Sequence, residues 1–314
     1  MIEPEVIYGT TVKIPQPAPN ENILNAGKER RDQKWIWEDL PDFFDKVTYN
    51  KSGDLILTVE QEEYASQEVS RCKKGVFIYI NGVLRWFPPK YYFYLKFWVL
   101  EDGNRPEYRD SDRRYFTFLQ HWEKIQWTLG TVRGKCRRQG ASSQATSNLV
   151  YECIFVLNSN CGLVSKTRDD ARATFTDMIA FGYRQLPPFL KPKQINSEDS
   201  VTEFIFEQKI EAGDKKEIRR SKLNYKAPVI NAYDSGRMSR ILIDEGGKLP
   251  PDVPANQMLA IVSRTLVKGV KRVGFVEMPS TVNKLTKGGA GFKIIWENAD
   301  LNKKTPTINR LVRY

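Results

Sequence analysis

The sequence predicts an α/β fold with a mainly parallel central sheet flanked by helices. Strand-like and helix-like segments alternate over residues 127–297, which is typical of parallel strands joined by crossover helices. A loop at 133–143, containing glycine and serine, separates a predicted strand from a predicted helix. A short hydrophobic strand at 239–245 ends in two acidic residues. The last two features predict a ligand site at one edge of the sheet.

The composition and charge of the chain indicate which class of protein to expect. The chain has 314 residues, of which 40% are hydrophobic, so it can bury a core rather than remain disordered. Its net charge of +11 favours a polyanionic partner, nucleic acid above all; a basic surface without such a partner is the alternative. No apolar run approaches the ~20 residues of a membrane span, and the N-terminus lacks a signal-peptide pattern. We therefore expect a cytoplasmic protein.

The cysteines and the single histidine argue against two kinds of site. No cysteine pair has C-x-x-C spacing, so free thiols in a reducing compartment are expected. His121 has no neighbours suited to metal binding, so neither a zinc site nor a Ser-His-Asp triad is expected. The cysteines are Cys72, Cys136, Cys153 and Cys161.

The N-terminal part of the chain gives weaker signals. Residues 1–70 are polar and poor in periodicity, so they are predicted to form an extension, with one short helix at 35–47. Asn81-Gly82 predicts a turn between two strands in the aromatic stretch 76–100. Apolar residues at helical spacing predict a helix within 105–127.

Further along, the predicted elements alternate. The charged stretch 209–225 is predicted to be a hairpin or an exposed loop. Pro187 is expected to end the helix predicted at 168–186. Strands are predicted at 127–132, 161–167, 201–208, 226–234, 239–245, 272–278 and 291–297, and helices at 142–158, 168–186 and 255–267.

The loop "RGKCRRQGASS" (133–143) differs from the usual phosphate-binding pattern G-x-x-x-x-G-K-[ST]. Ala141 stands where the lysine is expected, whereas Lys135 lies six positions earlier. Gly140 lets the backbone close around phosphate oxygens, and Ser142 has the position of the magnesium-binding hydroxyl. On these residues alone, a capped loop without a nucleotide is an alternative.

Two acids follow the buried strand "RILI". Asp244 at the end of a parallel strand is expected to hold magnesium, directly or through water, and Glu245 to activate the attacking water. A simple turn is the alternative for this pair. In "VGFVEMPST", Ser280 and Thr281 follow another strand and could sense the γ-phosphate, or else form a capped turn.

Together these motifs resemble the ATPase domain of the large terminase subunit, the DNA-packaging motor of tailed bacteriophages, and that of the crAss-like phages in particular. The resemblance covers about residues 75–314. It implies a P-loop NTPase of the additional-strand, catalytic-glutamate type that uses ATP and Mg²⁺. It rests on "WFPPKYYFYLKFWVLEDGNRPEYRDSDRRYF", "GTVRGKCRRQGASSQATSNLVYECIF", "CGLVSKTRDDARATF", "RILIDEGGK" and "GFKIIWENAD".

The family explains the position of the lysine. Several members carry a variant Walker A loop, K-x-x-R-x-G-x-S, which matches Lys135, Arg138, Gly140 and Ser142. The resemblance implies that Lys135 reaches the β- and γ-phosphates and that Asp244-Glu245 is the Walker B pair. The residues implied to surround the phosphates are Lys135, Gln139, Gly140, Ala141, Ser142 and Ser143.

The resemblance also implies further roles. Arg137 or Arg138 is implied to stabilise the transition state from within the subunit. Where a neighbouring subunit supplies that arginine, the candidates are Arg168, Arg219 and Arg220. Tyr92, Phe93 and Tyr94 match an aromatic segment near the adenine, although core packing is the alternative; Ser280 and Thr281 match the coupling motif.

The implied function is a motor domain, at residues 71–314, that hydrolyses ATP and moves double-stranded DNA into the prohead. The implied partners are the DNA, the portal protein, the small terminase subunit and further copies in a pentameric ring, in the cytoplasm of the infected host. The nuclease domain of large terminases is expected to be absent from this chain, so DNA cleavage is not predicted. The alternatives are a helicase-like DNA-dependent ATPase and an inactive basic nucleic-acid-binding module.

Overall fold

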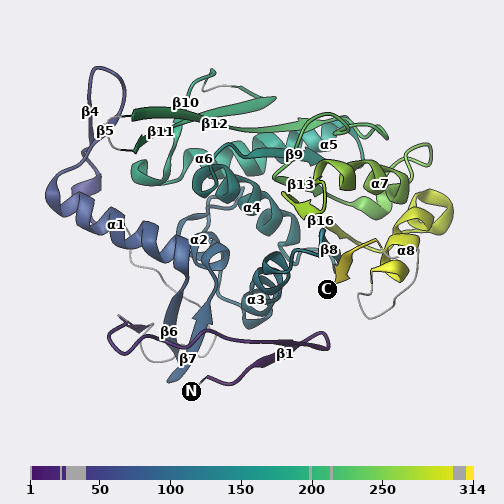
Figure 1. Cartoon of the computed structure of the whole chain (residues 1–314), viewed down its shortest axis with the longest axis horizontal. Helices are drawn as coiled ribbons and strands as arrows, with labels where there is room; N and C mark the ends of the chain where they lie inside the picture. The colour runs from purple at the N-terminus through teal and green to yellow at the C-terminus, as the bar shows by residue number, and fades with distance from the viewer. Residues whose placement is uncertain (1, 22, 26–39, 198–199, 213–214, 300–308) are drawn as a thin grey trace. The chain divides into compact units, whose positions relative to one another are not determined.

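The computed structural model describes residues 2–21, 23–25, 40–197, 200–212, 215–299 and 309–314 (Figure 1). The chain divides into two compact units. The first consists of Met1–His121 and Arg184–Lys193, and the second of Trp122–Tyr183 and Gln194–Tyr314. Helix α3 (Asp110–Lys124) confirms the helix predicted within 105–127. The boundary between the units falls within it.

The first unit combines short strands with helices. The antiparallel pairs are β1–β2, β4–β5 and β6–β7, and β3 pairs parallel with β6. Its elements are β1 (Glu5–Ile7), β2 (Thr10–Val12), β3 (Leu24–Asn25), β4 (Thr48–Tyr49), β5 (Leu55–Ile56), β6 (Val76–Ile80), β7 (Val83–Phe87), α1 (Val59–Lys74), α2 (Pro89–Phe97), and the 3₁₀ turns η1 (Asp42–Phe44) and η3 (Pro188–Leu190).

A hairpin turn and a helix cap in the first unit follow directly from the residues that form them. Asn81 and Gly82 both have positive φ (49° and 74°), which two-residue hairpin turns between twisted strands need, so the predicted turn is confirmed. Thr58 and Gln61 cap the start of α1 reciprocally.

Because α1 runs across residue 70, the extension predicted for residues 1–70 shares a helix with the residues that follow it. Most of the helix predicted at 35–47 lies outside the described residues, and its end forms η1.

The second unit is built on an eight-stranded sheet with the order β10-β11-β12-β9-β13-β16-β8-β17. From β12 to β17 every neighbouring pair is parallel, and β11 is antiparallel to β12. The sheet strands are β8 (Gly130–Gly134), β9 (Asn160–Val164), β10 (Lys193–Gln194), β11 (Glu203–Ala212), β12 (Lys215–Lys226), β13 (Arg240–Ile243), β16 (Phe275–Ser280) and β17 (Leu311–Arg313); β14 (Val267–Lys268) and β15 (Lys271–Arg272) form a small hairpin.

Helices cover this sheet, as predicted. The side chains of Ile241 and Ile243 in β13 join a core with α7 and α8, whereas the next strand, β16, turns Glu277 toward Asn148 of α4. The helical elements are α4 (Ala141–Phe155), α5 (Arg168–Ala173), the π-helical segment η2 (Thr174–Ala180), α6 (Phe181–Arg184), α7 (Ala255–Thr265), α8 (Gly289–Asn298), and the 3₁₀ turns η4 (Gly246–Lys248) and η5 (Leu285–Lys287).

Two predicted strands are wrong. Of the strand predicted at 226–234, only Lys226 belongs to β12. Residues 227–234 lie beyond its end and form turns, because Pro228 lacks an amide donor and Tyr233 folds over β9, where its hydroxyl accepts from Leu163 N at 3.1 Å. Residues 291–297 belong to helix α8, where Phe292, Ile295 and Trp296 face the core at helical spacing.

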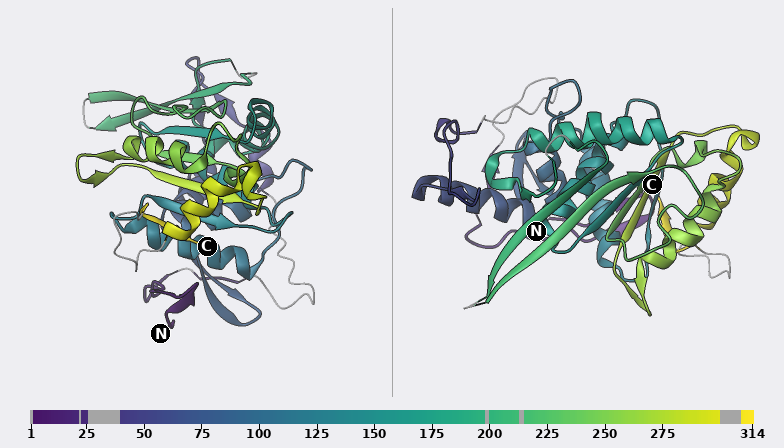
Figure 2. Two further views of the ribbon diagram at one scale, coloured as in Figure 1. Left: turned by 90° about the vertical axis from the view of Figure 1, so that its right-hand side faces the viewer. Right: turned by 90° about the horizontal axis from the view of Figure 1, so that it is seen from above.

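The charged stretch 209–225 belongs to a long antiparallel hairpin, β11–β12, so the first of its two predicted alternatives is confirmed. Figure 2 shows the hairpin extending as a two-stranded green ribbon in the right-hand view. Strand β17 was not predicted; it pairs parallel with β8.

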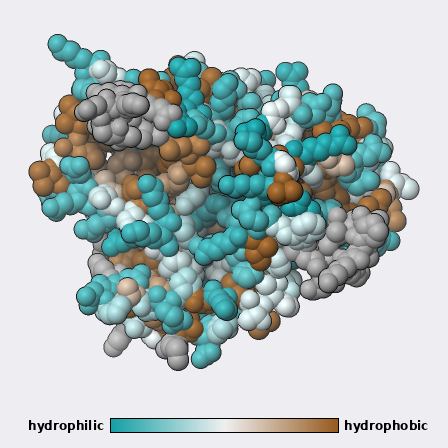
Figure 3. Space-filling view, in the orientation of Figure 1, coloured by the Kyte–Doolittle hydropathy of each residue, from teal (hydrophilic) through white to brown (hydrophobic). Residues whose placement is uncertain are grey.

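Apolar side chains are concentrated inside the units. On the face drawn in Figure 3, hydrophilic residues are interspersed with hydrophobic ones. None of the described helices is both long and apolar enough to cross a bilayer.

Candidate active site

The candidate site is built on the loop between β8 and α4. Gly140 precedes the first residue of α4 and has a φ of 74°, a left-handed conformation that glycine adopts without strain. Arg138 has a φ of 64°, so the backbone turns sharply twice within three residues. This loop begins directly at the carboxyl end of a parallel strand and opens a helix, which is the backbone context of a phosphate-binding loop.

The amine of Lys135 lies at the centre of the site. Its Nζ is 2.8 Å from Ser142 Oγ, 3.4 Å from Asp244 Oδ1 and 3.3 Å from Glu245 Oε1. The side chain therefore spans the loop from its first residue to the first turn of α4. Ala141 is buried, and a lysine there would have to leave the core. The structure thus brings together the front lysine, the serine and both acids.

Asp244 follows β13 directly. Its backbone N–H donates to Val164 O of the neighbouring strand β9 at 2.8 Å, and Ser142 Oγ donates to its Oδ1 at 3.0 Å. Burial raises the pKa of this carboxyl group, while Lys135 and Ser142 act in the opposite direction. One strand, β16, separates β13 from β8, so the predicted arrangement of the two motifs on one edge is confirmed.

Glu245 is held on both of its carboxylate oxygens. Oε1 faces Lys135, and Oε2 lies 2.7 Å from Lys248 Nζ and accepts from Thr281 Oγ1 at 3.3 Å. Partial burial opposes ionisation, but the hydrogen bond from Lys248 and the charge of Lys135 outweigh it and lower the pKa of Glu245. Glu245 has a φ of 53°, an uncommon conformation for a residue with a side chain.

The end of β16 contacts both motifs. Ser280 O accepts from Lys135 N at 2.9 Å, and Ser280 Oγ accepts from Gly247 N at 2.9 Å. Thr281 reaches Glu245. A Cβ on Gly247 would lie 2.9 Å from Ser280 Oγ, so this close approach requires glycine. The two hydroxyl residues predicted to couple the site are therefore in direct contact with it.

The remaining loop residues surround this centre. Arg137 and Arg138 are exposed and, within the described part of the chain, neither forms an ion pair with a carboxylate. Gln139 Oε1 accepts from Cys136 N at 3.1 Å and so stabilises the turn. Ser143 is buried in the first turn of α4. The predicted roles of these residues stay predictions.

The aromatic residues predicted near the adenine lie in helix α2 of the first unit. Tyr92 and Phe93 are 1% and 0% exposed, and Tyr94 is also buried. Tyr92 Oη donates to Glu68 Oε2 at 2.7 Å. With no exposed ring face, either residue would need this core to repack before it could contact a base. Their role at the nucleotide stays a prediction, and core packing is what the structure describes.

Lys248 was missed by sequence reasoning. It lies three residues after Glu245, on the turn that returns its amine to that carboxylate. The motif D-E-G-G-K carried the signal, because two glycines allow such a tight turn after the acidic pair. No periodic pattern marks a residue of this kind.

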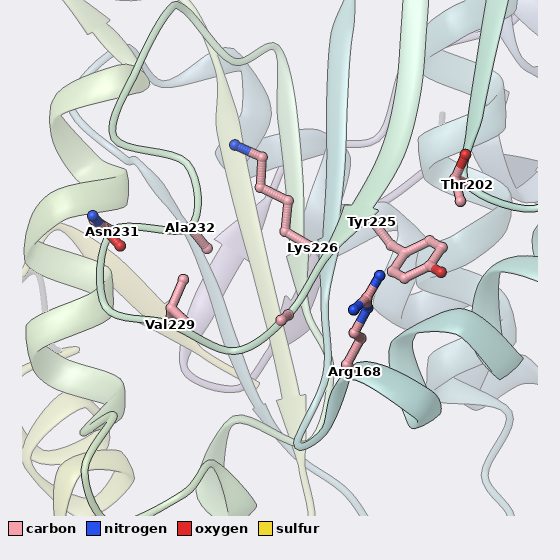
Figure 4. Close-up of a pocket in the computed structure, with 8 residues that line it drawn as sticks. Arg168, Thr202, Tyr225, Lys226, Val229, Asn231 and Ala232 are labelled. Atoms are coloured by element: carbon pink, nitrogen blue, oxygen red, sulfur yellow. The ribbon is translucent and has the colours of Figure 1, made fainter.

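A cavity lies where β12 ends and α5 begins, with a volume of about 520 Å³. Arg168, one of the arginines predicted to act on a neighbouring subunit, lines it together with Tyr225 and Lys226. Figure 4 shows Tyr225 and Lys226 extending in different directions from the end of the strand. Arg220, another of those arginines, is exposed on β12.

The residues present suit a magnesium ion. Ser142 Oγ and Asp244 Oδ1 are hard oxygen donors 3.0 Å apart, and magnesium is usually held by one or two protein oxygens plus phosphate oxygens and water. Among the described residues, no group of three or more His, Cys, Asp or Glu side chains could hold a metal by itself. A nucleotide-dependent ion is consistent with this donor set.

Comparison with known proteins identifies the fold of this chain through its likeness to solved structures. No protein-family model and no curated protein matches the sequence. The large terminase of bacteriophage HK97 has a similar structure, with a TM-score of 0.50 and 10% identity over 71% of this chain and 42% of that one. The ATPase domain of the Thermus phage P74-26 large terminase gives 0.42, with 16% identity over 64% and 83%. A large terminase from another thermophilic bacteriophage, in complex with ATP-gamma-S, gives 0.37, with 12% identity over 60% and 39%.

The chain therefore has a P-loop NTPase fold, as the HK97 likeness and the strand order both indicate. It spans less than half the length of the HK97 protein. At this identity the likeness concerns the fold alone. Activity, ligands and partners have to be argued from the residues of this chain.

Proposed function

We propose that this chain is an ATP-hydrolysing motor domain of a phage large terminase and moves double-stranded DNA into a prohead. The observation that supports this most is the convergence of Lys135, Ser142, Asp244 and Glu245 at the carboxyl edge of the sheet. Sequence motifs resembling those of terminases support the specific role, and the assignment to crAss-like phages rests on these motifs alone. Motor function is assigned to residues 71–314.

ATP binding would use the loop and the helix that follows it. Lys135 would exchange its contacts with Asp244 and Glu245 for the β- and γ-phosphates, and backbone amides of residues 139–143 would point at phosphate oxygens, helped by the dipole of α4. Ser142 and Asp244 would hold Mg²⁺, which when bound offsets negative charge on the β- and γ-phosphates.

Hydrolysis would use the two oxygens of Glu245 differently. When Lys135 turns to the phosphates, Oε1 becomes available to accept a proton from water, while Lys248 and Thr281 keep hold of Oε2. The water oxygen bonds to the γ-phosphorus, the bond to the bridging oxygen breaks, and ADP leaves with that electron pair. Arg137 or Arg138 would offset the charge that spreads over the γ-phosphoryl group.

Release of phosphate would be sensed at the end of β16. Ser280 contacts the first residue of the phosphate loop, and Thr281 contacts Glu245, so a shift of either motif changes contacts made by this strand end. We assign the coupling role to these two residues.

The partners follow from the proposed role and from the charge. The net charge of +11 suits duplex DNA, gripped through its phosphates without regard to sequence. The portal protein, the small terminase subunit and a pentameric ring of copies are proposed partners, with the site of action on the prohead in the host cytoplasm.

A phosphate-release assay with ATP, Mg²⁺ and duplex DNA tests the proposal. DNA-stimulated turnover by the natural chain, lost in Lys135→Ala, is the expected result. Absence of turnover under all conditions would leave the basic nucleic-acid-binding module as the function. Strand separation on a forked duplex would indicate the helicase-like alternative.

A further inference from the structure

Positive side chains gather at the end of the sheet opposite to the candidate active site. They are Lys268, Lys271, Arg272 and Arg310, with Trp127 beside them, and we refer to these five residues as the cationic edge. All five belong to the second unit. Within the described part of the chain, none of the four cations forms an ion pair with a carboxylate.

Two lysines face each other across the hairpin β14–β15. Lys268 is directly opposite Lys271 in the register, and both are exposed. Like charges in this arrangement destabilise a strand pair. Val270 at the tip is 100% exposed, so the hairpin buries no apolar residue there that would explain its presence. This pairing is consistent with a hairpin that presents positive charge to a partner.

The two arginines are fixed to one turn by neutral partners. Arg272 Nη1 donates to Thr128 O at 2.7 Å, and Arg310 Nε donates to Trp127 O at 2.7 Å. Arg310 also stacks on the ring of Trp127, 4.3 Å from its centroid, and that ring is 52% exposed. Burial, together with the charges of Arg240 and Arg310, lowers the pKa of Arg272, while Glu123 acts against this. Backbone carbonyls orient these cations without cancelling their charge.

Three adjacent strands connect this edge to the active site. In β8, β16 and β17, a residue of the cationic edge lies just before the strand begins: Trp127, Arg272 and Arg310. At the other ends, β8 leads into Lys135 and β16 into Thr281. β17 leads into Tyr314, whose carbonyl accepts from Gly134 N at 3.0 Å. The strands are mutually parallel neighbours, so each links the two ends rigidly.

We propose that the cationic edge binds the phosphate backbone of duplex DNA. The inference rests on the proposed DNA-translocating function and names the surface that holds the DNA. Lys268 and Lys271 contact phosphates as flexible point charges, and Arg310, stacked on Trp127, contacts them as a pre-oriented fork. The contacts are with the backbone, so they do not depend on base sequence.

The test compares two double variants of the full chain that lose equal charge. Lys268→Ala/Lys271→Ala removes both lysines of the hairpin. Lys73→Ala/Lys74→Ala removes two exposed lysines of α1 in the first unit. Affinity for a duplex is measured by filter binding across a salt series. The hairpin variant should bind at least about tenfold more weakly at low salt, and its log–log salt slope should fall by about two, one for each lost phosphate contact. The α1 variant should match the natural chain.

The outcomes separate this inference from the proposed function. A melting temperature equal to that of the natural chain confirms that the hairpin variant is folded. If that variant binds DNA with the natural affinity and slope, the cationic edge is not the DNA surface, and an acidic protein face becomes its better partner, while the DNA motor stands. If the natural chain binds no duplex at any salt concentration while it hydrolyses ATP, both the DNA motor and this inference fail.

Discussion

At the scale of single residues, Lys135 is proposed to take the place of a lysine that most phosphate loops carry after their last glycine. Lys135→Ala should abolish hydrolysis and weaken ATP binding by about 2 kcal/mol or more, because a charge-assisted contact to phosphate is lost. Nucleotide affinity by calorimetry and phosphate release measure the two effects. The natural chain should hydrolyse ATP with Ala141 in place, so the substitution Ala141→Lys should not be needed for turnover. Full activity of Lys135→Ala, or activity created by Ala141→Lys, would show that the loop works differently.

Lys248 is a positioning residue for Glu245 in the proposed mechanism. Lys248→Met removes the charge that holds Oε2 at 2.7 Å, so the base should lose its orientation and kcat should fall by about tenfold or more. The affinity for ATP should stay unchanged, because Lys248 is not proposed to contact phosphate. Lys248→Arg should restore part of kcat. Lys293→Met on α8 is the matched control, because the one ion pair that Lys293 forms among the described residues is an exposed pair with Glu297. A change in ATP affinity with unchanged kcat would contradict this role.

At the scale of elements, the buried guanidinium group at the start of β13 lies beside carboxylates of the second unit that come from three other elements, namely α3, α4 and β16. Arg240 is fully buried and pairs with Glu123, while Glu277 of β16 and Glu152 of α4 lie within 3.5 and 3.7 Å. Burial disfavours its charge, but the attraction of these carboxylates is larger and raises the pKa of Arg240. The network therefore links helix and sheet through charge as well as through apolar packing.

Arg240→Met should lower the free energy of unfolding by about 3–5 kcal/mol, because it leaves the buried carboxylate of Glu277 and the partly buried carboxylates of Glu123 and Glu152 without their cation. Urea unfolding followed by circular dichroism measures this difference. Arg237→Met, a few residues earlier and exposed, should change stability by no more than about 0.5 kcal/mol. Equal stability of the two variants would mean that water already screens the cluster.

At the scale of the whole molecule, nucleotide and DNA binding should be linked. Glu245→Gln keeps the shape of the side chain but removes the base, so ATP should bind while turnover slows by about 10²–10⁴-fold. A motor that grips and releases in step with hydrolysis must change its DNA affinity in that trapped state. Filter binding of duplex DNA by this variant, with and without ATP, measures the change. Binding that responds to neither ATP nor salt would argue against a motor.

Local chemistry was sufficient for much of the fold and of the site. Asn81-Gly82 formed the predicted turn, and the serine-rich start of α4 and the acids after β13 lie where the sequence predicted. Each of these signals is carried by a few neighbouring residues. A short apolar run such as 291–297 is different, because its residues suit a strand or a helix equally until a core is available on one side.

By itself, the sequence predicted the residues that meet at the candidate site and most of the alternating strands and helices of the second unit, because loop, cap and turn preferences act over a few residues. The tertiary structure alone decided that Lys248 and Thr281 hold one oxygen of Glu245, that β17 pairs with β8, and that Tyr92 is buried. These contacts join residues that a local pattern does not relate. They form only once strand pairing and the core bring the segments together, so packing decides them rather than propensity.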